Sequence, residues 1–418
     1  MKVYLTSVGC KLNQSESESW ARELASLGCQ VVDAPDAADL CLANTCAVTH
    51  VAARKSRQLV RRLNRSNPEA ALVIAGCYAE LNPEEATGLP GVTFVAGTAE
   101  KALLVQRIVQ RFGITAKEST GGALPAPSGL RTRALVKIQD GCDNVCTYCV
   151  VRLARGRQRS QPVEDVLAEV LAREAEGYQE VVLTGVHIGA FGQEHGESLA
   201  GLVGTVLGRT RLPRLRLSSI EPWDVNDDLL QLWADRRLCP HLHLPLQSGC
   251  DATLQRMGRR YSTSHFLNIV ERARSKIPNL AVTTDVIVGF PGEDADEFAQ
   301  SLSFISEARF SRIHVFPFSV RPGTAAFQMS PKVAPEVVSQ RVARMLDLGR
   351  ESSRNYRSRF INTRTEVLWE SERDGLWSGL TGNFLRVEAR GDLALRNRIT
   401  AVWLNGLTAT GMHGELCT

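Results

Sequence analysis

Short apolar runs alternate with helical spacing of apolar residues along the first part of the chain. Strand-like runs occupy residues 2–7, 39–43, 72–75 and 93–96, and helical patterns occupy residues 13–27, 51–63 and 101–112. In the first helical pattern, Trp20, Leu24 and Leu27 share one face. This alternation is typical of a doubly wound parallel sheet, so we predict an α/β unit over residues 1–115.

A segment rich in glycine and proline follows this unit. Residues 116–130 contain three glycines and two prolines, which predicts a linker. From residue 131 the alternation resumes, with strand-like runs at 134–139, 180–184, 214–218, 241–245, 281–288 and 312–317 and a helix at 335–358. Six strands with intervening helices fit a partial (β/α) barrel over residues 131–356. Side chains at the carboxyl ends of its strands would build the site.

The pattern changes again near residue 357. Short alternating segments, broken by Gly or Asn, are predicted at 366–370, 377–381, 385–389, 399–404 and 408–412. Such spacing favours a small all-β barrel over residues 357–418.

Composition narrows the class of protein. The 418 residues are 44% hydrophobic and 22% charged, which is an ordinary globular composition with a net charge of +4. No apolar run reaches the roughly 18 residues that span a bilayer, and the N-terminus lacks a signal core, so we expect a cytoplasmic protein without membrane contact. The chain has 11 cysteines, an odd number, which in this context indicates metal binding or catalysis rather than disulfides.

Three cysteines lie close together after the first predicted barrel strand. Cys142, Cys146 and Cys149 stand in GCDNVCTYC with the spacing C-x3-C-x2-C; we call them the barrel triad. Three thiolates on one loop can bind three irons of a cubane, whereas a structural zinc site would need a fourth protein ligand that is not nearby. The open iron can bind an amine and a carboxylate, which S-adenosylmethionine offers. An electron passed into its sulfonium would then yield a 5′-deoxyadenosyl radical.

Three more cysteines each follow a predicted strand of the first unit. Cys10, Cys46 and Cys77, the N-terminal triad, stand in the contexts VGCKLNQSESE, ANTCAVT and AGCYAE. The carboxyl ends of parallel strands share one edge, so these thiols can converge there. The alternative is three buried apolar thiols. The other cysteines have no partner spacing and are interpreted as structural: Cys29, Cys41, Cys239, Cys250 and Cys417.

With these motifs the chain resembles the radical S-adenosylmethionine superfamily and, within it, the methylthiotransferase family, over essentially its whole length. The resemblance implies two [4Fe-4S] clusters, one on each triad, and S-adenosylmethionine as cofactors. It also implies that the central unit is a barrel of the radical S-adenosylmethionine type. The C-terminal unit resembles the RNA-binding TRAM module.

Further motifs extend the match and imply contacts to the cofactor. They are LTGVHIGAFG, LSSIEPWDV, HLHLPLQSGCDATLQRMGRRYS, TDVIVGFPGE and HVFPFSVRPGTAA. The residues implied are Tyr148, Thr184, Gly185, Glu221, Gln247 and Gly289. For Thr184 and Gly185 the alternative is an ordinary turn between strand and helix. Gly289, with Gly292, would permit close approach of the backbone to a cofactor. The chain departs from the family where Arg152 and Arg157 stand at positions at which proline is common.

Basic residues cluster where an RNA could lie. One cluster beside the barrel triad is Arg152, Arg155, Arg157 and Arg159, and others are Arg54–Arg65, Arg256–Arg260 and the arginines of the helix at 335–358. Such clusters can neutralise phosphates, although a solvated helix face is the alternative. In the C-terminal unit, Trp377, Phe384 and Trp403 are candidates for stacking on bases.

The family reaction replaces the C2 hydrogen of an adenine with a methylthio group. One branch acts on isopentenyladenosine in tRNA, a second on threonylcarbamoyladenosine at tRNA position 37, and a third on an aspartate of a ribosomal protein. After Cys10, the residues Lys11, Asn13 and Gln14 resemble the second branch. The expected partners are the tRNA anticodon loop with adenosine 37 and a low-potential electron donor such as flavodoxin or ferredoxin, with the chain a monomer. The other two branches, and a non-catalytic iron–sulfur RNA sensor, remain alternatives.

Overall fold

Five parallel strands form the sheet of the first unit in this computed structural model, which describes residues 1–114, 131–391 and 394–417. Their order is β2-β1-β3-β4-β5, with bounds Gln30–Val31, Lys2–Ser7, Leu40–Thr45, Ala71–Gly76 and Val92–Ala96. The helices are α1 (Lys11–Ser26), α2 (His50–Ser66), α3 (Cys77–Leu81), α4 (Pro83–Thr87) and α5 (Leu104–Phe112). The predicted linker at 116–130 lies outside the described residues.

Helices cover both faces of this sheet, because successive residues of a strand point to opposite sides. Leu42 packs with Trp20 and Leu24 of α1 on one face. Ala43, the next residue, packs with Leu59 of α2 on the other. This confirms the predicted doubly wound architecture.

Six parallel strands form the partial barrel of the central unit. They lie in two three-stranded sheets, β10-β9-β6 and β11-β12-β13, with bounds Arg214–Leu217, Glu180–Thr184, Ala134–Lys137, His241–His243, Ala281–Val288 and Arg312–Pro317. Single bridges from Leu215 to Leu238 and from Ser219 to His243 connect the two sheets, which gives the predicted partial barrel. The helices are α6 (Val151–Arg155), α7 (Val163–Ala175), α8 (Leu199–Arg209), α9 (Asp227–Gln231), α10 (Asp251–Arg256), α11 (Thr263–Lys276), α12 (Ala295–Ala308) and α13 (Pro335–Ser358).

The first barrel strand is shorter than the sequence predicts. We expected it to run through Gln139, but β6 ends at Lys137, and Gln139–Asp140 forms β7, which pairs antiparallel with β8 (Arg159–Ser160). The Gln139 side chain donates to the carbonyls of Asp140 and Gly141, so it turns the chain away from the barrel. The loop that carries the barrel triad therefore begins and ends on this small ribbon.

The C-terminal strands close into a five-stranded barrel in the order β14-β15-β16-β18-β17. Their bounds are Thr363–Arg373, Leu376–Thr381, Arg386–Arg390, Met412–Leu416 and Ile399–Leu407. The predicted strand at 408–412 was wrong: Thr408 and Gly411 form a turn, in which the Thr408 hydroxyl accepts from the Gly411 backbone, and the strand starts only at Met412. Trp369, Val387 and Val402 fill the interior.

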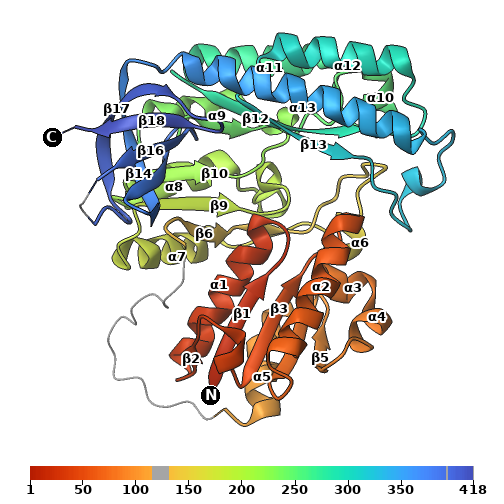
Figure 1. Cartoon of the computed structure of the whole chain (residues 1–418), viewed down its shortest axis with the longest axis vertical. Helices are drawn as coiled ribbons and strands as arrows, with labels where there is room; N and C mark the ends of the chain where they lie inside the picture. Colours follow the sequence, from red (N-terminus) through yellow and green to blue (C-terminus); the bar gives the residue numbers. More distant parts are fainter. Residues whose placement is uncertain (115–130, 392–393, 418) are drawn as a thin grey trace.

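The sheet of the first unit lies against the mouth of the partial barrel, and the C-terminal barrel lies at its other end (Figure 1). Helix α1 runs beside β6, where the Ser15 hydroxyl donates to the carbonyl of Leu135 at 3.0 Å. Within the described residues, none of the helices has both the length and the apolar character needed to cross a bilayer. This arrangement brings the carboxyl ends of β1, β3 and β4 close to the loop of the barrel triad.

Candidate active site between two cysteine triads

The N-terminal triad lies at the carboxyl edge of the first sheet. Cys10 directly precedes α1, Cys46 directly follows β3, and Cys77 is the first residue of α3 after β4. Cys46 and Cys77 are buried and Cys10 is exposed, and all three are free of disulfides. Because β1, β3 and β4 are neighbours in a parallel sheet, the strand order itself brings the three residues to one place.

Two glycines allow the three loops to approach. Gly9 has φ +113°, and a Cβ there would lie 2.6 Å from Cys46 Cβ and 2.9 Å from its Sγ. Gly76 has φ +106°, and a Cβ there would lie 2.4 Å from the carbonyl oxygen of Thr45. Any side chain at either position would therefore push Cys10 or Cys77 away from Cys46.

The thiols of this triad influence one another electrostatically. Burial raises the pKa of the Cys46 thiol to about 12, and the neighbouring thiols of Cys77 and Cys10 add to the increase. In the part of the chain that the structure describes, no three His, Cys, Asp or Glu side chains surround a position for a single metal ion. A cubane binds each thiolate at a different iron, and its positive charge offsets the repulsion between thiolates, so the donor set fits an iron–sulfur cluster.

The barrel triad lies on the loop between β7 and α6. Cys142, Cys146 and Cys149 are all partly exposed. The loop is closed at its base, where the Cys142 backbone donates to the carbonyl of Gly156 at 3.2 Å. Burial raises the pKa of Cys149 to about 12, and the thiols of Cys146 and Cys142 add to it. Three thiols on one loop, without a disulfide, again fit a cluster.

Two cationic side chains stand beside this triad. Arg259 is buried, its Nη1 lies 3.4 Å from Cys146 Sγ, and it forms an ion pair with Glu221. His187 Nε2 lies 2.6 Å from Asp224 Oδ2. Burial favours the neutral imidazole, but hydrogen bonds to Asp224 and Cys142 outweigh it and raise the pKa of His187 to about 9.

Gln139 holds the turn after β9 against the barrel-triad loop. Its side-chain oxygen accepts from the backbone of Val186 at 3.0 Å and of His187 at 2.8 Å. A Cβ on Gly185 would lie 2.9 Å from the Gln139 carbonyl, and Thr184 is buried at the strand end. Sequence reasoning selected Thr184 and Gly185 and missed Gln139 and His187, which no motif spacing marks.

The other implied cofactor residues divide. Tyr148 packs edge-on against Phe290, with ring centroids 6.5 Å apart. Gln247 has φ +71°, and its backbone donates to Asp285 on β12. Gly289 corrects the expectation: a Cβ there would lie 2.5 Å from Val338 of α13, so its small size serves packing against that helix rather than approach to a cofactor.

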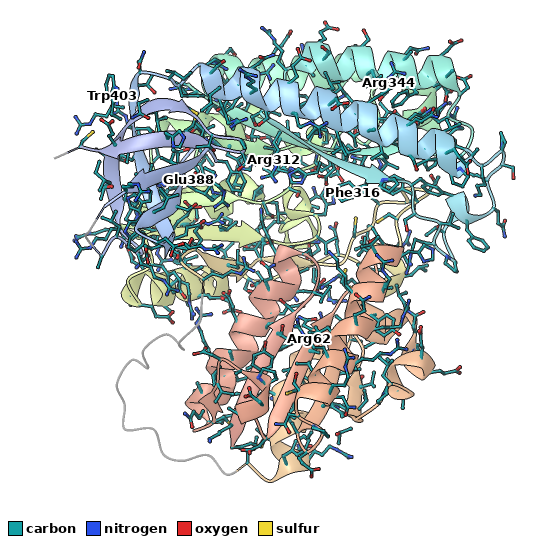
Figure 2. The ribbon with its side chains drawn as sticks, viewed as in Figure 1. Arg62, Arg312, Phe316, Arg344, Glu388 and Trp403 are labelled. Carbon is teal, nitrogen blue, oxygen red and sulfur yellow. The ribbon has the colours of Figure 1, made fainter. Side chains whose placement is uncertain are left out.

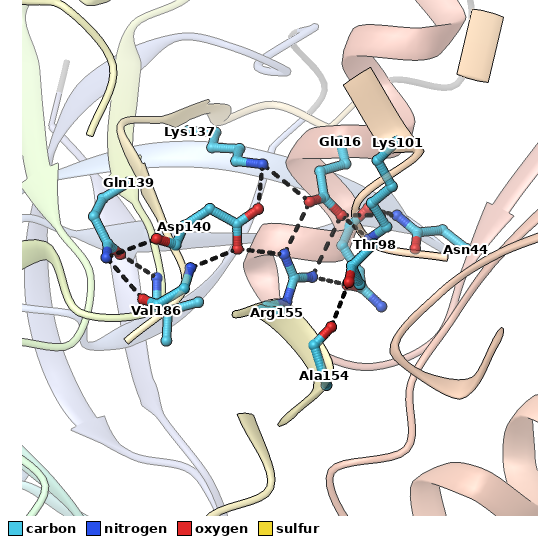
Figure 3. Close-up of polar contacts among 12 residues, drawn as sticks. Glu16, Asn44, Thr98, Lys101, Lys137, Gln139, Asp140, Ala154, Arg155 and Val186 are labelled. Atoms are coloured by element: carbon cyan, nitrogen blue, oxygen red, sulfur yellow. Dashed lines mark hydrogen bonds and ion pairs between the residues drawn. The ribbon is translucent and has the colours of Figure 1, made fainter. Parts of the chain in front are cut away.

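Arg155 links the two triads and does not lie on the surface (Figure 3). Its guanidinium donates to Glu16 Oε1 at 3.0 Å, to Asp140 Oδ1 at 2.9 Å and to Asn13 Oδ1 at 2.6 Å. Although burial opposes ionisation, the charges of Lys101, Arg155 and Lys137 hold the pKa of Glu16 well below its usual range. The expected RNA contact at Arg155 is therefore corrected, because this side chain is buried among its own carboxylates.

The remaining basic residues differ in exposure. Arg152, Arg157 and Arg159 are exposed, as are Arg61 and, labelled in Figure 2, Arg62 of α2. Others are occupied within the fold: Arg256 with Glu297, Arg259 with Glu221, and Arg341 with Glu293.

Of the C-terminal aromatic side chains, only one stands open to solvent among the three we singled out. Trp377 is buried in the barrel interior, and Phe384 stacks on His241 at 4.7 Å between ring centroids. Trp403 is 43% exposed and projects outward (Figure 2).

Lys11, the residue after Cys10, points toward the partial barrel. Burial lowers the pKa of its ammonium to about 8, and the charges of Arg216 and Arg133 add to the lowering, whereas Glu180 and Asp285 oppose it. These groups belong to the barrel strands or directly precede them, so the first unit contributes a cation to the barrel interior.

Comparison with known proteins gives two family matches. Residues 2–97 match the model described as uncharacterized protein family UPF0004, and residues 136–305 match that of the radical SAM superfamily. The solved structure of TsrM, a radical S-adenosylmethionine methyltransferase from Kitasatospora setae, is similar in fold. Its TM-score is 0.58 at 14% identity, covering 78% of this chain and 76% of that one.

Curated relatives match nearly the whole chain. The threonylcarbamoyladenosine tRNA methylthiotransferase MtaB of Thermotoga maritima is 40% identical, over 88% of this chain and 86% of its own length. The Bacillus subtilis protein of the same name is 36% identical over 95% and 92%. A tRNA-2-methylthio-N(6)-dimethylallyladenosine synthase from Carboxydothermus hydrogenoformans is 34% identical over 82% of each.

Proposed function

The chain belongs to the tRNA methylthiotransferase family of radical S-adenosylmethionine enzymes, and from this premise we propose that it converts N6-threonylcarbamoyladenosine at tRNA position 37 to its 2-methylthio derivative. The observation that carries the proposal is the meeting of two cysteine triads at one interface, with Lys11 of the branch-specific sequence beside Cys10. The relatives at 36–40% identity that are named for threonylcarbamoyladenosine support this branch.

Family membership implies one [4Fe-4S] cluster and S-adenosylmethionine. We assign this cluster to Cys142, Cys146 and Cys149, and a second one to Cys10, Cys46 and Cys77. When bound, these groups supply a carbon-centred radical and a sulfur source, which an adenine C2–H requires because no side-chain base can deprotonate it. The chain itself places positive charge beside two barrel-triad thiols: Arg259 near Cys146 and His187 near Cys142. Positive charge stabilises thiolates and so favours cluster binding.

Several residues act by positioning. Gln139 holds the Thr184–Gly185 turn against the barrel-triad loop, and we assign that turn to cofactor contact together with Tyr148, Glu221 and Gln247. Glu221 keeps Arg259 in place through their ion pair. Arg155 and Glu16 keep the two triads at a fixed separation.

The three units divide the work in this proposal. Residues 1–115 hold the second cluster, residues 131–356 carry the radical chemistry, and residues 357–418 form a TRAM-like module that binds tRNA. The exposed Arg152, Arg157 and Arg159 contact phosphates of the anticodon loop. A low-potential donor such as flavodoxin or ferredoxin supplies electrons to a monomeric enzyme in the cytoplasm, where tRNA is modified.

Anaerobic reconstitution tests the two-cluster proposal. The wild-type chain is expected to bind about eight irons, four per cluster, and to form 5′-deoxyadenosine on reduction. Cys142→Ala is expected to abolish both S-adenosylmethionine cleavage and modification. Cys46→Ala is expected to keep some cleavage and lose sulfur insertion, while Cys29→Ala, a buried cysteine outside both triads, serves as the control. Four irons and no cleavage in the wild type would instead indicate an iron–sulfur RNA sensor.

A further inference from the structure

Lys11 reaches the interior of the partial barrel from another unit of the chain. Its charge interacts with Glu180 of β9, Arg216 of β10 and Asp285 of β12, and it also affects His241 of β11 and His314 of β13. Since these groups come from five neighbouring strands that curve around one interior, the ammonium lies in front of the inner face of the barrel. Its backbone directly follows Cys10.

The charged groups around Lys11 already have partners, and Lys11 does not. Arg216 pairs with Glu180 at 2.6 Å, Arg133 with Glu370 at 2.7 Å, and Asp285 lies 3.3 Å from His243. Across residues 1–114, 131–391 and 394–417, no carboxylate forms an ion pair with Lys11. A cation withdrawn from water without a counter-ion is unfavourable, so this position is suited to an anion that arrives from outside.

The wall facing Lys11 is polar. The Thr283 hydroxyl lies 3.0 Å from His241 Nε2 and 2.9 Å from His243 Nδ1, and the His243 ring meets His314 edge-on at 5.9 Å. Such a wall can satisfy a ligand that carries hydroxyl and carbonyl groups. It offers little to an apolar prenyl chain, whose burial needs apolar neighbours.

We propose that Lys11 is a specificity residue that pairs with the free carboxylate of the threonylcarbamoyl substituent in its open form. The inference rests on the proposed function, because that substituent is the anionic part of the base. In adenine, C2 and the C6 carbon that bears the substituent flank the same ring nitrogen. A side chain next to Cys10, close to where C2 must react, is therefore within reach of the substituent. A site that pairs a buried charge rejects analogues lacking the partner more strongly than an apolar pocket does.

Binding of defined tRNAs to the full-length reconstituted protein tests this role. Fluorescence anisotropy would compare four forms of one tRNA that differ at position 37: adenosine, open threonylcarbamoyladenosine, its carboxylate methyl ester and its cyclised form, in which the carboxylate is consumed. Wild type is expected to prefer the open acid over each of the other three by about 10- to 100-fold, the range for one hydrogen bond to a charged group.

Variants assign the preference to the residue. Lys11→Met is expected to lose the preference and Lys11→Arg to retain part of it, while Lys276→Met, which removes a surface lysine paired with Asp227 on α11, is expected to keep it. Wild-type binding of the methyl ester or cyclised form as tightly as the open acid would overturn the inference, and this arm does not depend on how a variant folds. Full preference in Lys11→Met would also overturn it. Failure of the proposed function is seen separately, as absence of 2-methylthio-threonylcarbamoyladenosine from the wild-type reaction.

Discussion

Arg155 and Glu16, which are 139 residues apart in the sequence, form a buried ion pair with 3.0 Å between Nη1 and Oε1 (Figure 3). Arg155 ends α6, just beyond the barrel triad, and Glu16 lies in α1, just beyond Cys10. The pair therefore connects the segments that follow two cysteines of different triads. Asp140, which flanks the barrel-triad loop, shares the same guanidinium at 2.9 Å.

Arg155→Met is expected to destabilise the protein by about 3–5 kcal/mol, because it leaves buried carboxylates without their counter-charge. Urea unfolding of the full-length protein measures this. Arg157→Met is the matched control, since the Arg157 side chain, two residues away, is 81% exposed. Equal unfolding midpoints for the two variants would contradict the structural role of the pair.

Arg259→Met is expected to make the reduction potential of the barrel-triad cluster more negative. The guanidinium lies 3.4 Å from Cys146 Sγ, and positive charge or a hydrogen bond at a cluster sulfur stabilises the reduced state. A redox titration followed by electron paramagnetic resonance gives the potential. Arg260→Met removes the neighbouring, exposed arginine and is expected to leave it unchanged. A potential that shifts equally in both variants would argue against a local effect of Arg259.

Stability is expected to fall as the pH rises from about 4.5 to above 7, through Glu18. Burial raises the pKa of this carboxyl from 4.5 to about 7, against the opposing charges of Arg22 and Arg131. In that interval the folded protein keeps a proton that the unfolded chain has released, so folding loses free energy as pH increases. Glu18→Gln should flatten the dependence of the unfolding midpoint on pH.

Glu69→Gln, which changes an exposed glutamate, provides the control for Glu18→Gln. Its unfolding midpoint should follow pH as the wild type does. If Glu18→Gln and Glu69→Gln show the same pH dependence, Glu18 does not carry the effect.

The sequence was sufficient for features whose signals are local. Each triad cysteine has its own motif next to a strand, so the strand order alone brings Cys10, Cys46 and Cys77 to one edge. Arg155 was misjudged because four arginines within eight residues resemble a basic patch, while its partner Glu16 is 139 residues away. Gly289 was misjudged for the same reason: Val338, which explains it, belongs to a helix that packs only in three dimensions.

Arg157→Ala is expected to weaken tRNA binding and to reduce its salt dependence. Removal of one cation from a phosphate should lower the slope of log affinity against log salt by about 0.7–0.9. Filter binding between low and moderate salt measures the slope. Arg209→Ala, an exposed arginine of α8 paired with Glu164, serves as the control. An unchanged slope for Arg157→Ala would remove this residue from the RNA-binding surface.

The nucleoside composition of tRNA tests the central claim most directly. The chain would be expressed in a bacterial strain that makes threonylcarbamoyladenosine but lacks its methylthiotransferase, and digested tRNA would be analysed by mass spectrometry. We predict that 2-methylthio-threonylcarbamoyladenosine appears with the wild-type chain and is absent with Cys142→Ala. Unmodified threonylcarbamoyladenosine together with newly methylthiolated isopentenyladenosine, or with a methylthiolated ribosomal aspartate, would contradict the account.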